Sequence, residues 1–274
     1  MKAKVYLLDY TKDADAMLIF TKNTRHLDDP GGLESIKKEH QGYKDAQLEY
    51  VFNTISGCWE FVDYTFLITG VTRAFTHQLV RHRVGVAFAQ QSLRLPAEGR
   101  KWDYLATGKC DPKKGYPESP DETLDGYEYD IPYSYYKAIS KSFRAYEDLV
   151  RNGADAQDAR GVLPTNVLTN IMMKINLRAL SEMTHVRLCV RAQGEFQDVV
   201  KQLVALAVEV HPFVEPVMGP ECVVKGVCKF PRFDGCPIKA RHTFLQRGTL
   251  DGIKRRIRED WSKFGGFSPQ PKKA

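Results

Sequence analysis

The residues of this sequence that could take part in chemistry are concentrated in two clusters of arginines and amides. The first cluster begins at Gln78, contains the triplet Arg81-His82-Arg83, and ends with Gln90-Gln91-Ser92-Leu93-Arg94. Guanidinium groups are planar, charged donors that match phosphate and carbonyl oxygens. A basic triplet is usually part of a solvated surface, but apolar residues and a second polar set flank this one. The cluster is therefore interpreted either as a binding site for an anion or as part of a solvated surface.

The second cluster starts at Arg160. Pro164 and Thr165 are typical first residues of a helix, so the sequence predicts a helix over about 165–187. Arg160 would then precede the start of this helix, where an anion is well placed.

Four further polar residues lie along this predicted helix. On a regular helix Asn176 and Arg187, eleven residues apart, would share a face, whereas Arg178 and Glu182 would point nearly the opposite way. An ordinary surface ion pair is the alternative to a functional role for Arg178 and Glu182.

Several catalytic motifs are missing from the sequence. It has no glycine-rich nucleotide loop after a strand, no P-loop, no H-E-x-x-H, no paired-carboxylate spacing and no cysteine in a nucleophile setting. The spacing of Cys222, Cys228, Cys236 and His242 does not match a common zinc site, so we expect no metal and reduced thiols. The residues thus favour a planar, phosphate-bearing ligand, with the chemistry supplied by a cofactor.

The elements that must position these clusters alternate between strands and helices. Strands are predicted over residues 4–8 and 64–70, and a long surface excursion over 96–132. Helices are predicted over about 13–20, 33–55, 72–82, 133–152 and 198–210, in addition to 165–187. No repeat or linker separates two cores, so we expect a single α+β domain over residues 1–240.

The net charge of the 274-residue chain is +6, but the charge is unevenly distributed. Residues 241–274 contain nine Lys and Arg against three Asp and Glu, which leaves residues 1–240 neutral. We interpret this segment as a basic C-terminal extension rather than a nucleic-acid site. No apolar run reaches the length of about 20 residues that a membrane span needs, and the first residues do not form a signal peptide. The sequence predicts a cytoplasmic protein without a membrane or nucleic-acid partner.

Taken together, the two clusters resemble the signature of the flavin-dependent thymidylate synthase family. The matching motifs are Arg81-His82-Arg83 with a later Ser92, then Ala159-Arg160 with Leu163-Pro164, and a helix with Asn176-x-Arg178 and Arg187-Leu188. Upstream, Trp59-Glu60-Phe61 and Tyr64-Thr65-Phe66 resemble the family's Leu-Glu-His and Phe-Thr-Phe. The resemblance covers most of residues 17–240 and extends to the cysteine-bearing segment around Cys222.

The resemblance implies the fold of that family, in which a central, mostly antiparallel sheet is packed by long helices. It also implies the reductive methylation of dUMP to dTMP. Methylenetetrahydrofolate would donate the carbon, and FAD reduced by NADPH would donate the hydride. Family members are homotetramers whose active sites lie between protomers, so opposite faces of one helix can serve different sites. This arrangement would give both faces of the helix a function.

The resemblance also assigns roles to individual residues. Arg187 would be catalytic, because it would face the uracil ring and stabilise negative charge during activation. The predicted dUMP contacts are Gln78, Arg81, Gln90, Gln91, Ser92, Leu93, Arg94, Arg160 and Arg187. The predicted FAD contacts are Arg81, His82, Arg83, Gln90, Asn176, Arg178 and Glu182.

Four departures from the family pattern concern mainly the flavin side. The spacer between Arg83 and Ser92 is eight residues long where seven is usual, so a bulge is expected there. Ile55 and Gly57 stand where a flavin-binding His and a Ser or Thr are common, and Phe61 replaces another His. The usual Tyr after Arg94 is Leu95, and an Asn expected near the flavin is Glu182. These changes leave two alternatives open, namely hydroxymethylation of a pyrimidine nucleotide and, from another class, an arginine-rich RNA-binding protein.

Overall fold

The computed structural model describes residues 3–94, 104–105, 131–230, 232 and 236. The extension 241–274 and His242 lie outside the described residues. The expected excursion over 96–132 also lies outside them, apart from residues 104–105 and the backbone of residues 131–132.

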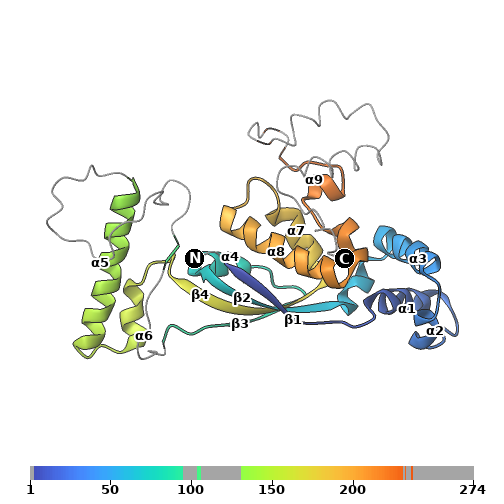
Figure 1. The fold of residues 1–274 in the computed structure, drawn as a ribbon, viewed down its shortest axis with the longest axis horizontal. Coiled ribbons are helices and arrows are strands. Elements are labelled where there is room, and N and C mark those ends of the chain that lie inside the picture. The colour runs from blue at the N-terminus through green and yellow to red at the C-terminus, as the bar shows by residue number, and fades with distance from the viewer. Residues whose placement is uncertain (1–2, 95–103, 106–130, 231, 233–235, 237–274) are drawn as a thin grey trace, which may run out of the picture. The chain divides into compact units, whose positions relative to one another are not determined.

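The centre of the fold is a four-stranded sheet in the order β1-β2-β4-β3 (Figure 1). Its strands are β1 (Lys4–Tyr10), β2 (Asp63–Thr72), β3 (Val86–Gln90) and β4 (Leu168–Asn176). Hydrogen bonds at the strand ends show that neighbours run antiparallel. The end of β1 meets the start of β2 through Thr11 N to Asp63 O at 3.0 Å, and Asn176 N at the end of β4 donates to Gly85 O before β3 at 2.9 Å. The expected α+β class with an antiparallel sheet is confirmed.

Strand β4 replaces the first half of the helix expected over 165–187, and that expectation was wrong. The side chains of Ile171, Met173 and Ile175 are buried, whereas those of Asn170, Met172 and Lys174 are exposed. This period of two fits a half-buried strand and not a helix. Pro164 and Thr165 therefore do not begin a helix, and the helical part of the segment is α7 (Leu177–Arg187).

The N-terminal helices form a group beside η1 (Ser56–Phe61), a 3₁₀ helix. They are α1 (Ala14–His26), α2 (Leu33–Lys37) and α3 (Gln41–Thr54). The sequence predicted one helix over 33–55, but the chain breaks after α2. His40 caps α3, because its Nδ1 accepts the backbone N–H of Tyr43 at 3.1 Å. A side-chain cap of this kind starts a new helix.

The remaining helices follow the strands. They are α4 (Arg73–Leu79), α5 (Ile131–Arg151), α6 (Ala156–Ala159), η3 (Arg160–Val162), α7, α8 (Gly194–Val210), η4 (Pro212–Val217) and α9 (Glu221–Val224). Helix α8 packs along β1, and α7 packs against α8 and α9 (Figure 1). The predictions of helices near α5 and α8 are confirmed.

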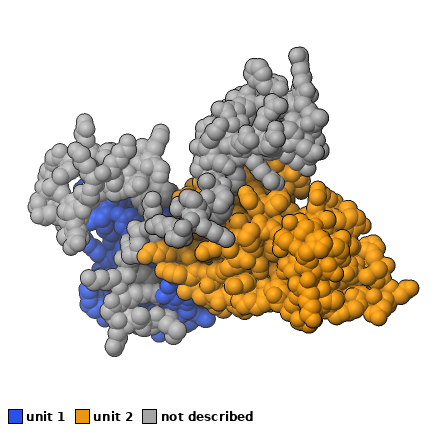
Figure 2. Space-filling view, turned by 45° about the vertical axis from the view of Figure 1, so that its right-hand side comes forward, with its two compact units in different colours: residues 1–2, 69–80, 89–171 blue, residues 3–68, 81–88, 172–274 orange. Residues whose placement is uncertain are grey.

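The chain divides into two compact units, coloured separately in Figure 2. Unit 1 comprises residues 1–2, 69–80 and 89–171, and unit 2 comprises residues 3–68, 81–88 and 172–274. Strands β2, β3 and β4 each have residues in both units. In the part of the chain that the structure describes, no helix combines the length and apolarity required to cross a bilayer.

Candidate functional site

The predicted site residues fall into both units. The division follows their expected ligands only in part, because Arg81 and Arg187 of unit 2 are also predicted nucleotide contacts and Gln90 of unit 1 is also a predicted flavin contact. Unit 1 contains Gln78, the segment Gln90–Arg94 and Arg160, which are expected at the nucleotide. Unit 2 contains the triplet Arg81-His82-Arg83, all predicted flavin contacts of the second cluster, and Arg187. Each group is described below within its own unit.

Helix α4 positions the start of the first cluster in unit 1. Thr72 caps it by accepting the backbone N–H of Phe75 at 2.9 Å, and Phe75 and Leu79 are fully buried. The helix ends at Leu79, so the helix predicted over 72–82 is shorter than expected. Gln78 therefore lies on the helix, whereas Arg81 and His82 follow its end.

Gln90 and Gln91 are fixed at the end of β3 by hydrogen bonds within unit 1. The Gln90 amide donates to Thr76 Oγ1 at 2.9 Å. Gln91 pairs with Asn170 of β4, since Gln91 N donates to Asn170 O at 3.0 Å and Asn170 N donates to Gln91 Oε1 at 3.3 Å. These bonds orient the amides before any ligand binds, which lowers the entropic cost of binding.

Arg73 and Arg160 form a pair of like charges in unit 1. Burial lowers the pKa of Arg73, and the positive charge of Arg160 lowers it further. Within the described residues neither guanidinium makes an ion pair with a carboxylate. Arg73 Nη1 donates to Gln91 O at 3.5 Å, and Arg160 Nε donates to Gln157 O at 3.1 Å. Two guanidinium groups that share a region without a carboxylate suit an anion such as a phosphate.

The segment that follows Gln91 ends the described part of the first cluster. Leu93 is buried and anchors it, whereas Arg94 is exposed. The Ser92 hydroxyl accepts the backbone N–H of Arg94 at 3.1 Å, which shapes a local turn. The segment thus presents polar groups beside a buried anchor.

Arg187, His82 and Phe196 form the centre of the site in unit 2. Arg187 Nε donates to His82 Nε2 at 3.4 Å, and the Arg187 guanidinium lies over the Phe196 ring at 4.2 Å from its centroid. Burial lowers the pKa of His82, and the charge of Arg187 lowers it further. The imidazole is therefore neutral at neutral pH and can accept this hydrogen bond, while the guanidinium keeps its charge.

The turn that carries Arg81, His82 and Arg83 is joined to the start of α7. Asn176 caps α7, because its Oδ1 accepts the backbone N–H of Ala179 at 2.8 Å. Its backbone N–H donates to Gly85 O at 2.9 Å. Asn176 is thus the last residue of a strand and the cap of a helix, a position that its polar side chain suits.

Arg178 is held by two carboxylates in unit 2. Its guanidinium contacts Glu60 Oε1 at 2.7 Å and Glu182 Oε1 at 3.3 Å. These hydrogen bonds raise the pKa of Arg178, that to Glu60 most. The ion pair that the sequence offered as the alternative for Arg178 and Glu182 is therefore present, and Glu60 extends it.

The departures near η1 differ in their surroundings. Ile55 is buried, with 7% of its surface exposed, whereas 60% of Phe61 is exposed. Ile55 therefore contributes to packing. Phe61 presents an apolar ring to solvent next to Glu60, the partner of Arg178.

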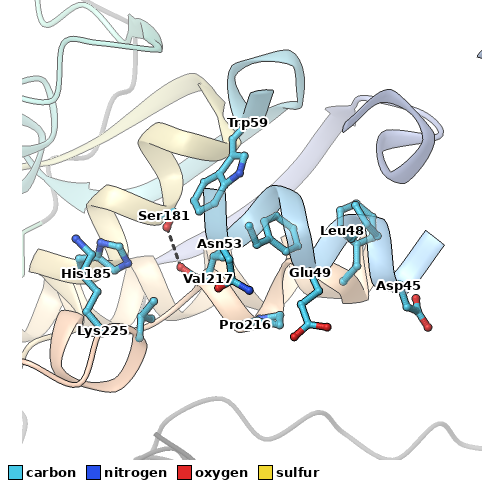
Figure 3. A pocket seen from close by; sticks show the side chains of 13 residues that line it. Asp45, Leu48, Glu49, Asn53, Trp59, Ser181, His185, Pro216, Val217 and Lys225 are labelled. Atoms are coloured by element: carbon cyan, nitrogen blue, oxygen red, sulfur yellow. Dashed lines mark hydrogen bonds between the residues drawn. The ribbon is translucent and has the colours of Figure 1, made fainter. Parts of the chain in front are cut away.

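A pocket of about 890 Å³ lies in unit 2 between α3, η1, α7, η4 and α9 (Figure 3). Trp59, Ser181 and His185 line it, and none of its described lining residues belongs to the predicted nucleotide or flavin contacts. Trp59 Nε1 and His185 Nε2 are buried, and neither has a hydrogen-bond partner among the residues that the structure describes. Burial lowers the pKa of His185 to about 4, so this imidazole is neutral at neutral pH.

The cysteines near the end of the described chain do not form a metal centre in this structure. Cys222 lies on α9, and burial raises the pKa of its thiol to about 12. Among the residues that the structure describes, no group of three or more His, Cys, Asp or Glu side chains could hold a metal ion.

Three residues that contact the predicted site residues, Arg73, Glu60 and Phe196, are not among the residues predicted from the sequence. For Arg73, the signal in the sequence was its position directly after Thr72, a residue type that commonly caps a helix, at the start of the helix that precedes Arg81. Glu60 was noted only as part of a motif, and its bond to Arg178 joins residues 118 positions apart. Phe196 carries no sequence signal, since only the packing of α8 beside α7 places it under Arg187.

Known proteins resemble this chain in sequence and in fold. Residues 6–213 match the model of the family described as thymidylate synthase complementing protein. A flavin-dependent thymidylate synthase from Sulfolobus acidocaldarius is 30% identical over 227 residues, which cover 81% of this chain and 78% of that protein. One from Thermococcus onnurineus is 30% identical over 234 residues, which cover 82% of this chain and 88% of that protein.

A solved structure shares the fold. It is the UMP/dUMP methylase PolB from Streptomyces cacaoi bound with 5-Br dUMP, which aligns with a TM-score of 0.60 at 19% identity. The alignment covers 79% of this chain and 94% of that one. The family match and the extent of the identity together show that this chain is an enzyme of the thymidylate synthase complementing protein family, the flavin-dependent thymidylate synthases.

Proposed function

We propose that the protein reductively methylates dUMP to dTMP, with methylenetetrahydrofolate as carbon donor and NADPH as the source of the reducing equivalents. The observation that carries this proposal is the arrangement of Arg187 on Phe196 and beside a neutral His82. It holds a charged, planar donor in a half-buried place, where its interaction with a ligand is stronger than in water. The family membership supports the reaction type.

Arg187 has the catalytic role in this proposal. Its guanidinium donates to a uracil carbonyl and stabilises the negative charge that develops on the ring as the ring becomes reactive at carbon 5. Because the aromatic ring of Phe196 already fixes the guanidinium, little reorganisation accompanies that step. No protein nucleophile is required, which agrees with the absence of one in the sequence motifs.

The phosphate of dUMP is the ligand that we assign to Arg73 and Arg160. Their like charges lie near each other without an ion-pair partner among the described residues, so a phosphate would relieve their repulsion. Gln90 and Gln91, held by Thr76 and Asn170, are placed to contact the nucleoside with their remaining polar atoms. Gln78, Ser92, Leu93 and Arg94 complete the proposed nucleotide contacts.

The donors of unit 2 fit a flavin dinucleotide in their chemistry. When bound, FAD supplies the hydride for the reaction. The exposed guanidinium groups of Arg81 and Arg83 suit its diphosphate, and His82 and the Asn176 amide add neutral polar contacts. Arg178 fits only if the cofactor replaces a carboxylate, since Glu60 and Glu182 hold it here.

A homotetramer with shared active sites is part of the proposal. The apolar side chains of Tyr6 and Leu8 on β1 and of Met172 on β4 are 47%, 53% and 42% exposed. Exposed apolar groups on strands are typical of surfaces that another chain covers. Light scattering on the purified protein would test the tetramer, and a monomer would contradict it.

The proposal also includes a cytoplasmic location.

Product identification tests the function directly. Purified protein is incubated with dUMP, methylenetetrahydrofolate, NADPH and FAD, and the nucleotide is identified by mass spectrometry. We expect dTMP, and we expect the purified protein to carry visible flavin absorbance. A protein that binds no flavin but binds polyanions with a steep dependence on salt would instead support the RNA-binding alternative.

Hydroxymethylation of the nucleotide is the second candidate. The pairing of Arg178 with Glu182 favours it, because an acidic group stands on the flavin side where the family has Asn. A product heavier than dTMP by one oxygen in the same assay would establish this reaction and exclude the methylation.

A further inference from the structure

Gly85 lies in the turn between Arg83 and strand β3, in a conformation that L-amino acids rarely adopt. Its φ angle is +70°. This left-handed region costs glycine little, whereas a side chain there clashes with the neighbouring backbone. Gly85 is only two residues after the triplet, so the conformation of this turn determines the position of Arg81, His82 and Arg83.

The space beside Gly85 is filled by the side chain of Asn176. A Cβ atom on residue 85 would lie 2.4 Å from Asn176 Nδ2 and 2.7 Å from both Cγ and Oδ1. Distances below 3.0 Å essentially never occur for real Cβ atoms, so any side chain here would displace the amide. Only glycine allows the two residues to approach this closely.

The Asn176 amide cannot move without losing other contacts. Its Oδ1 accepts the N–H of Ala179 and so caps α7, and its backbone N–H donates to Gly85 O. The next N–H, that of Leu177, donates to Val62 O at 2.7 Å. Asn176 is also buried, with 8% of its surface exposed. The turn and the start of α7 are therefore joined at one point, with Gly85 on one side and the capping amide on the other.

We propose that Gly85 is a positioning residue, whose missing side chain lets the turn carrying Arg81, His82 and Arg83 close on the capping amide of Asn176, and so aligns both for one ligand. The ligand is the flavin dinucleotide, an assignment that rests on the proposed function. Gly85 acts through its neighbours and makes no contact with the flavin itself. A methyl group at this position separates the triplet from Asn176 while leaving all their side chains in the protein.

The test compares two glycines with positive φ. Gly85→Ala adds both backbone strain and the clash, whereas Gly153→Ala adds strain alone, because Gly153 has φ +91° and nothing within 4 Å of its Cβ position. FAD affinity is measured by fluorescence titration of the apoprotein, at a temperature well below the melting temperature of each variant. We expect Gly85→Ala to weaken FAD binding at least about tenfold, and Gly153→Ala less than about threefold.

A double-mutant cycle identifies the cause. Asn176→Ala removes the three atoms that a residue-85 side chain would meet, so Gly85→Ala in that background should reduce thermal stability and FAD affinity no more than Gly153→Ala does. Equal effects of Gly85→Ala in the two backgrounds would overturn the proposal, as would an affinity of Gly85→Ala that matches that of Gly153→Ala.

The proposed function and this inference fail in different ways. If the wild-type protein binds no FAD, the proposed function is wrong and the alignment for a flavin is wrong with it. The stability cycle still decides whether Gly85 and Asn176 are coupled. If the wild type binds FAD and the cycle shows no coupling, only the role of Gly85 is wrong.

Discussion

The arginines of the two units differ in the groups that hold their guanidinium groups. In unit 1, Arg73 and Arg160 lie near each other, and each makes its side-chain hydrogen bond to a backbone carbonyl. In unit 2, Arg178 is neutralised by two carboxylates, while Arg187 rests on an aromatic ring beside a neutral imidazole. One residue type thus occurs in three electrostatic settings.

This difference indicates which arginines are ready for a ligand. A guanidinium that already has carboxylate partners must lose them before it binds an anion. The free energy gained from the anion is then largely offset by the free energy lost with the carboxylates. Arginines held by carbonyls or placed beside another arginine keep their attraction for an anion. Among the described residues, Arg73 and Arg160 are therefore better suited than Arg178 to bind an anion, although the sequence motifs include Arg178 as readily.

The largest expected effect concerns Arg187. Arg187→Ala should reduce turnover by about 100-fold or more, because one preorganised donor to the developing charge is lost. Steady-state assays with dUMP measure this. Arg191→Ala is the matched control, since Arg191 lies over Phe230 at the same distance, 4.2 Å, and is not one of the predicted contacts. Equal activity of the two variants would refute the catalytic role.

The next effect distinguishes the arginines of unit 1. Arg160→Ala should raise the KM for dUMP about 10- to 100-fold, which is the loss expected for a hydrogen bond between charged groups. The control is Arg151→Ala, which removes an exposed arginine paired with Asp148 at 2.8 Å. A KM for Arg160→Ala that equals the control's would show that the like-charge pair does not bind the phosphate.

Phe196 tests whether the aromatic support of Arg187 is functional. Phe196→Leu keeps an apolar side chain but removes the ring face, so kcat should fall about 3- to 10-fold through the lost cation–π contact. Phe66→Leu removes another fully buried ring, in β2, and should lower stability similarly without this loss of kcat. If both variants lose stability and neither loses turnover, Phe196 serves only packing.

The smallest effect concerns the carboxylates around Arg178. Glu182→Asn should strengthen FAD binding about two- to fivefold, because it removes one of the two exposed ion pairs of Arg178 and leaves only Glu60 to be exchanged for the cofactor diphosphate. Glu221→Gln, which breaks the pairs with Lys225 and Lys229, should leave FAD affinity unchanged. Weaker FAD binding by Glu182→Asn would mean that the ion pair itself supports the site.

The sequence-based prediction succeeded where the pattern was local and failed where tertiary contacts decided. The periodic helices near α5 and α8 and the strands β1 and β2 were predicted close to their observed bounds. The segment Leu168–Asn176 lies in a predicted helix but forms a strand, because Pro164 and Thr165 are only a local signal of a helix start. Its pairing between β2 and β3 is a long-range property, which no local signal contains.

The sequence by itself determined the class of chemistry. Its arginines, amides and missing nucleophile indicated an anionic ligand and a cofactor, and its motifs indicated the family. Only the tertiary structure decided which arginines are available, because a guanidinium's affinity for an anion depends on partners such as Glu60 and Phe196, far away in the sequence. The same holds for the role proposed for Gly85, which depends on the Asn176 side chain that the fold places next to it.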